Sequence, residues 1–213
     1  MTETLRFRRL RFEVLETVRG ASPVGWRSEL HRRAWRRVLD DDLPGAIIIE
    51  DGARLMPGFV RFLQSGGYLH ADLTQFCYDR ARVWRWGGCD ASPGVRLRPL
   101  AAGAGLSSGY ALSQRGARQL LDGAGAAQDP ERSRQAVWPR DVARLDTLVS
   151  RPRLVAPPDW LADADREVAP AMLHGERDAA AVERPQSAAD RLRGLARGPL
   201  SRELSRAELS HGF

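Results

Sequence analysis

An early run of apolar residues, from Ala46 to Ile49, stands out from the polar sequence around it. The run holds all three isoleucines of the chain and ends abruptly on Glu50 and Asp51. Short runs of β-branched residues are typical of a strand buried on both faces. Carboxylates at the carboxyl end of such a strand stand where open α/β sheets bind ligands. Because Asp51-Gly52 is also a common turn dipeptide, a plain polar turn remains the alternative interpretation.

Apolar residues at helical spacing predict several helices around this strand. The first begins at Ser22-Pro23, since serine is a good N-cap and proline fits the first helical position. It ends at the Asp40-Asp41-Asp42 run, which we interpret as a solvated loop. The apolar stripe expected on this helix is Leu30, Ala34, Trp35 and Val38. Further helices are expected at 57–63, at 113–123 and around Val142, Leu145, Leu148 and Val149.

Alternating apolar and polar residues predict strands at 73–78, 83–86 and 95–99, and a short closing strand at 154–155. Trp84 and Trp86 would share one face of the second of these strands. They would either pack in the core or stack on a sugar. Helices and strands together indicate an α/β fold.

The two ends of the chain differ from its middle. An N-terminal helical segment is expected within residues 1–19, and the main domain covers residues 20–160. Residues 161–213 are rich in alanine, arginine and glutamate and poor in large apolar side chains. With only weak helical segments at 188–197 and 201–210, this tail is expected to be largely helical or disordered.

The basic residues of the chain are all arginine, 33 in number, and the formal net charge is +6. Lysine and asparagine are both missing, which indicates the codon usage of a GC-rich genome. The arginines are spread along the chain and interleaved with acids, so nucleic acid is not an expected partner. Peripheral contact with anionic headgroups at the inner face of a membrane is compatible with this charge.

The two cysteines, Cys77 and Cys89, form neither a metal-ligand spacing nor a disulfide framework. The N-terminal sequence lacks the apolar core and cleavage site of a signal peptide. No stretch approaches the length of a membrane span. We therefore expect a cytoplasmic location, in a reducing compartment.

Three sequence blocks, taken in order, resemble glycosyltransferase family 25, the lipopolysaccharide-type glycosyltransferases. The first block contains His31, Trp35, the isoleucine run, Glu50, Asp51, Pro57 and Phe59. The second contains Gly109, Tyr110, Ala111, Leu112, Ser113, Gly116, Ala117, Leu120 and Leu121. The third runs from 138 to 157. The resemblance covers about residues 20–160.

The resemblance implies a GT-A type fold, with a mixed sheet flanked by helices. It also implies transfer of a hexose from a UDP-sugar to a lipopolysaccharide or related surface glycan. It implies a divalent cation, Mn²⁺ or Mg²⁺, on Glu50 and Asp51, which also bind the donor. It makes His31 and Asp51 the catalytic candidates. Gly109, Tyr110 and Ser113 are further donor-binding candidates. From the residues alone, His31 could instead be a packing residue, and Ser113 a helix N-cap.

Several positions depart from the family pattern. Gly52 replaces a third acidic residue, Leu30 replaces a serine, and Val137 replaces an aspartate. The apolar strand and arginine-containing loop with which family members begin are not found, so the chain is expected to be truncated at its N-terminus. The alternative hypothesis is therefore a non-catalytic homologue that binds a glycan or a protein partner. An arginine-rich binder of nucleic acid or anionic membranes is a weaker third hypothesis.

Overall fold

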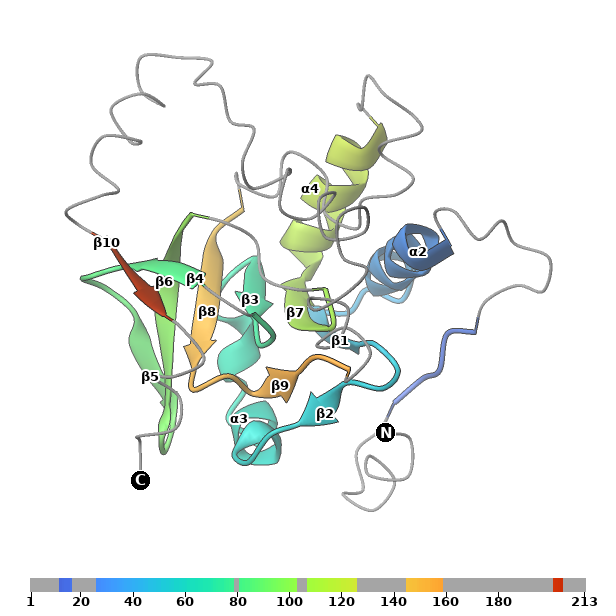
Figure 1. Ribbon diagram of the computed structural model, residues 1–213. Coiled ribbons are helices and arrows are strands. Elements are labelled where there is room, and N and C mark those ends of the chain that lie inside the picture. Colours follow the sequence, from blue (N-terminus) through green and yellow to red (C-terminus); the bar gives the residue numbers. More distant parts are fainter. Residues whose placement is uncertain are drawn as a thin grey trace, which may run out of the picture.

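The computed structural model describes residues 12–16, 26–78, 81–102, 107–125, 145–158 and 201–204. Within these residues the chain forms a mixed α/β fold, with one large sheet and few helices (Figure 1). The helices are α2 (Trp26–Asp40), α3 (Phe59–Gln64) and α4 (Gln114–Gly125), with a 3₁₀ turn η1 (Gly67–Leu69).

The large sheet has eight strands in the described part of the chain. These are β1 (Gly45–Ile49), β3 (Leu73–Gln75), β4 (Ala81–Trp84), β5 (Cys89–Ser92), β6 (Val95–Ala102), β7 (Gly109–Ser113), β8 (Thr147–Arg151) and β10 (Ser201–Leu204). Their order is β1-β7-β3-β8-β6-β4-β10, and β5 pairs with β6. The pair β3–β8 is parallel and the other pairs are antiparallel. A small second sheet pairs β2 (Arg54–Leu55) with β9 (Val155–Ala156).

The isoleucine run forms strand β1, at one end of the described strand order. Its side chains alternate between the two faces of the sheet. Ala46 and Ile48 pack against the hydrophobic cluster on one face, and Ile47 and Ile49 against the cluster on the other. The expectation of complete burial is wrong: every residue of β1 is only partly buried, because among the described strands β1 is paired along one edge.

Helices α2 and α4 lie side by side over one face of the sheet (Figure 1). The core between them and the sheet is apolar. Its buried members are Trp35, Val38, Leu73, Tyr110, Leu112, Ala117, Leu120 and Leu145. This layer puts the side chains of α2 directly above β1 and β7.

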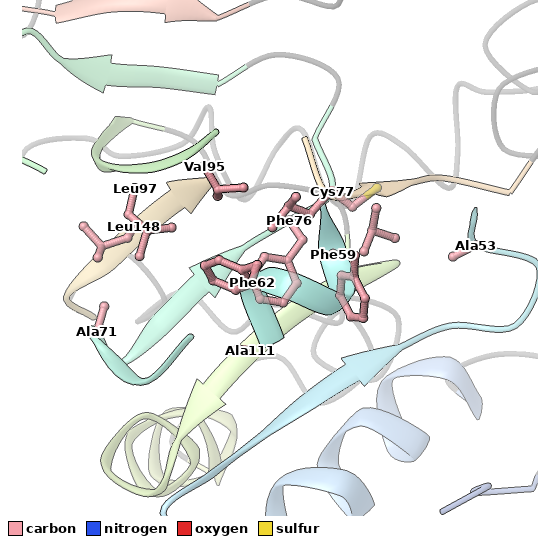
Figure 2. Packing of buried hydrophobic residues seen from close by; sticks show 12 residues of the cluster. Ala53, Phe59, Phe62, Ala71, Phe76, Cys77, Val95, Leu97, Ala111 and Leu148 are labelled. Carbon is pink, nitrogen blue, oxygen red and sulfur yellow. The ribbon is translucent and has the colours of Figure 1, made fainter. Parts of the chain in front are cut away.

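Helix α3 covers the other face, where an aromatic core lies between the helix and the sheet. Figure 2 shows Phe59 and Phe62 of α3 close to Phe76. The Phe76 ring meets the other two edge-on, with centroid distances of 6.1 Å to Phe59 and 5.4 Å to Phe62. Edge-to-face rings at this spacing add to the stabilisation that burial provides.

The helix expected around Leu148 and Val149 is wrong, because these residues lie in strand β8. β8 lies between β3 and β6 in the sheet, and both neighbours donate and accept backbone hydrogen bonds. In a short apolar run that is buried on both faces, apolar residues also occur at helical spacing, so periodicity alone does not separate a strand from a helix. β-branched Thr147 and Val149 also favour the extended backbone.

Other expectations also need correction. Ser201–Leu204 forms strand β10 on β4, where the sequence predicted the start of a weak helix. Residues 12–16, expected to be helical, are in neither a helix nor a strand. Strand β4 stops at Trp84 and leaves Trp86 65% exposed, so the two tryptophans do not share a strand face. Ser22-Pro23, Val137, Val142, residues 138–144 and most of the tail lie outside the described residues.

No helix among the described residues is long and apolar enough to cross a membrane. Both cysteines are free thiols. Cys77 is buried and Cys89 is partly exposed.

Candidate functional site

A group of polar side chains meets at the carboxyl end of β1, around Glu50. Arg27 donates from Nε to Oε1 at 2.7 Å and from Nη2 to Oε2 at 2.8 Å. The hydroxyls of Ser107 and Ser108 donate to Oε1 and Oε2, each at 2.9 Å. His31 Nε2 lies 2.9 Å from Oε1. Together with Trp35 and Tyr110, these residues form what we call the Glu50 cluster.

A second layer of hydrogen bonds orients the histidine. Trp35 Nε1 donates to the Tyr110 hydroxyl at 2.8 Å, and His31 Nδ1 lies 2.7 Å from the same oxygen. A neutral His31 protonated on Nε2 satisfies every bond: Tyr110 donates to Nδ1, and Nε2 donates to Glu50. We assign this tautomer from the bonding pattern.

Local sequence explains how the cluster forms. Arg27, His31 and Trp35 are spaced by four residues, so they lie on one face of α2. That face covers β1 and β7, and Ile49 of β1 pairs with Gly109 at the start of β7. The two serines directly before Gly109 are thereby brought to the end of β1, where the Glu50 N–H donates to the Ser108 carbonyl at 3.1 Å.

The cluster keeps its carboxylate charged and its phenol neutral. Burial alone would raise the pKa of Glu50, but the hydrogen bonds from His31 and Arg27 and the positive charge of Arg27 outweigh it. The net effect holds the pKa of Glu50 well below its usual range. Burial raises the pKa of Tyr110, with a smaller contribution from the Glu50 charge, so the hydroxyl stays protonated.

The structure brings three of the sequence candidates together: His31, Glu50 and Tyr110. Asp51 is adjacent and exposed, in the turn that Gly52 completes at φ 79°. This is a backbone conformation that glycine adopts readily. The Ala53 N–H donates back to the Glu50 carbonyl at 3.2 Å. The turn interpretation of this dipeptide is therefore confirmed, and Asp51 is presented to solvent by it.

The remaining candidates have structural roles. A Cβ on Gly109 would lie 2.7 Å from the side chain of Val155, so this position requires glycine for packing. Ser113 lies at the other end of β7 from the cluster, where its hydroxyl accepts from the Gly116 N–H at 3.0 Å. Ser113 is thus the N-cap of α4 and does not take part in the Glu50 cluster.

Arg27, Ser107 and Ser108 were missed by the sequence analysis. Arg27 could have been found from its place one helical turn before His31, on the face that carries Trp35. The two serines directly precede Gly109, and in the structure their hydroxyls donate to the Glu50 carboxylate. The predicted helix stripe is confirmed for Trp35 and Val38, which are buried. Ser28 and His31 are also buried, whereas Leu30 and Ala34 are only partly buried.

The site offers few oxygen ligands to a metal ion. Both oxygens of Glu50 are occupied by the five hydrogen bonds described above. Within the described ranges no group of three or more His, Cys, Asp or Glu side chains could hold a metal. A cation here would be held by Asp51 together with water and the phosphate oxygens of a ligand, an arrangement common for Mg²⁺.

No protein-family model and no curated protein matches this chain. The fold and the site therefore describe the class of this protein. It is a mixed α/β protein with a charged, hydrogen-bonded cluster at the carboxyl end of β1, the first strand in the described strand order.

Proposed function

We propose that this chain is a glycosyltransferase of the family 25 type, which transfers a hexose from a UDP-sugar to a lipopolysaccharide or related surface glycan. The observation that carries the proposal is that the first two sequence blocks resembling this family meet at the Glu50 cluster. Glu50 of the first block is held by Ser107 and Ser108, which directly precede the second block, 57 and 58 residues along the chain. Asp51, which directly follows Glu50, is exposed.

The proposed fold is of the GT-A type. A mixed sheet with helices on both faces supports this assignment. The acceptor class would place the protein on the cytoplasmic side, at the inner face of the membrane.

In this proposal Asp51 takes over the donor and metal role that Glu50 was expected to share. Glu50 instead anchors the N-terminal turn of α2 and the Ser107-Ser108 turn beside the site. His31 is 4% exposed and both its ring nitrogens are bonded. We therefore assign it a positioning role in place of a catalytic one. A divalent cation, when bound, would supply Lewis-acid neutralisation of the leaving diphosphate.

A non-catalytic homologue that binds a glycan or a partner is the second candidate. The saturation of Glu50 favours it, because Arg27 neutralises the carboxylate that the family resemblance assigned to metal binding. Under this proposal, donor or acceptor binds at the same edge of the sheet without turnover.

Calorimetric titration with UDP and UDP-hexoses, with and without Mn²⁺, tests the donor site. We expect Mn²⁺-dependent binding that Asp51→Ala abolishes. Asp122→Ala, which removes an exposed carboxylate from α4, is the matched control and should bind as the wild type does. Absence of binding under every condition would reject the donor site.

A UDP-release assay with lipopolysaccharide as acceptor separates the two candidates. Release above background, dependent on Asp51, supports the transferase. Donor or glycan binding without release supports the non-catalytic homologue.

A further inference from the structure

An open hollow of about 390 Å³ lies at the opposite end of β1 from the Glu50 cluster. Pro44, which precedes β1, is part of its wall. The five residues of β1 separate Pro44 from Glu50, and the extended chain between these two residues spans about 20 Å. The hollow is therefore distinct from the proposed donor site.

Arg115 forms a two-point ion pair in the wall of this hollow, although its side chain is 68% exposed. Its Nε and Nη2 each donate to the carboxylate of Asp72 at 2.7 Å. Asp72 is buried, and it also accepts from the Asp146 N–H at 3.2 Å and the Ser113 hydroxyl at 3.3 Å. A guanidinium has five N–H donors, and Asp72 takes two of them. The other donors are presented by a guanidinium that this ion pair orients, which lowers the entropic cost of binding.

Gln114 is held in the same way on the neighbouring wall. Its Nε2 donates to Asp42 Oδ1 at 2.7 Å, which orients the amide and its carbonyl oxygen. Exposed His70 and Asp146 add an imidazole and a carboxylate to the lining. Leu69 is also exposed and contributes an apolar surface.

We propose that this hollow binds a neutral sugar unit of a glycan chain. Hydroxyl groups both donate and accept, and the lining offers fixed donors on Arg115 and acceptors on Gln114 and Asp146. Arg115 and Asp72 cancel in charge, which argues against a strongly anionic ligand. The C–H face of a sugar ring fits the apolar surface of Leu69. Because the hollow is open, it suits one unit of a longer chain better than a small enclosed ligand.

This inference goes beyond the proposed transfer reaction, since it concerns a different edge of the sheet and requires no donor. If the chain is a transferase, the hollow would hold a part of the acceptor remote from the transfer point.

The test begins with the full chain applied to an array of defined neutral and acidic oligosaccharides, without nucleotide or metal. The strongest neutral ligand is then titrated by calorimetry into the wild type, Gln114→Ala, Arg115→Ala and Arg118→Ala. Losing one hydrogen bond should weaken binding about threefold to tenfold in each of the first two variants. Arg118 is exposed on the same helix and lies outside the hollow, so its variant is the matched control and should bind as the wild type does.

Arg115→Ala removes the guanidinium that pairs with buried Asp72, so the thermal unfolding of this variant is measured first. Gln114→Ala keeps that ion pair and carries the test if Arg115→Ala does not fold. The proposal is overturned if no neutral oligosaccharide binds, or if both hollow variants bind with wild-type affinity. Binding of acidic oligosaccharides alone, weakening steeply with salt, would also overturn it in favour of an anion site. Because no nucleotide is present, this outcome is independent of the UDP titrations.

Discussion

The guanidinium of Arg27 and the carboxylate of Glu50 form a two-point ion pair, with nitrogen–oxygen distances of 2.7 and 2.8 Å. The side chains are 24% and 14% exposed. Parallel N–H···O bonds between planar groups are among the stronger polar contacts in proteins. The pair ties α2 to the end of β1, and it occupies both carboxylate oxygens of Glu50. Both consequences can be measured.

Arg27→Ala should lower the free energy of unfolding by about 2 kcal/mol, because it leaves a largely buried carboxylate without its charged partner. Arg36 is the control on the same helix. It lies 2.8 Å from Glu29, but both side chains are half-exposed. Arg36→Ala should therefore change stability by about 0.5 kcal/mol or less. Urea unfolding of both variants is the measurement, and equal losses would contradict a stabilising role for the buried pair.

The free energy of unfolding should depend on pH through the titration of Glu50. The pKa of Glu50 is lowered in the folded protein, whereas a glutamate in an unfolded chain has a pKa of about 4.3. The stabilisation it contributes is therefore complete above that pH and is lost as pH falls below it, towards the folded pKa. Between about pH 5 and pH 3, the wild type should lose more stability than Glu50→Gln. Glu29→Gln, at an exposed position on α2, should keep the wild-type decline. Parallel curves for wild type and Glu50→Gln would show that the carboxylate is not stabilised in the fold.

The two thiols should differ sharply in reactivity. Cys77 is completely buried, whereas Cys89 is partly exposed and its Sγ lies 3.4 Å from Nδ1 of His70. A thiol-specific disulfide reagent should modify one thiol quickly in the folded protein and the second only on unfolding. Cys89→Ser should remove the fast phase and Cys77→Ser should leave it intact. A fast phase that survives Cys89→Ser would contradict this assignment.

Gly109→Ala should destabilise the protein by about 2 kcal/mol, because the new Cβ would lie 2.7 Å from Val155 and strain a tightly packed contact. The double variant Gly109→Ala with Val155→Ala should recover part of that loss, since the second substitution makes room. Thermal unfolding of the single and double variants completes the cycle. Strict additivity would argue that Gly109 has a role other than packing against Val155.

Much of the fold could be predicted from local sequence. The isoleucine run forms a strand, Ser113 caps the helix that follows it, and Asp51-Gly52 forms a turn. These features depend on residues within a few positions of one another, where periodicity and capping chemistry act. The helix predicted around Leu148 and Val149 was wrong, because strands β3 and β6, which are distant in sequence, pair with β8 and keep it extended.

The candidate site was predictable only in part. Helical spacing places His31 and Trp35 on one face, and Glu50 follows from the end of the strand. Nothing local indicates that Glu50 would be saturated by Arg27 and by serines 57 and 58 residues away. A hydrogen bond across such a separation exists only once β1 and β7 have paired and α2 has packed on them. Local sequence thus determines which charged groups stand at the end of β1, whereas tertiary packing decides that Glu50 is held internally and Asp51 faces solvent.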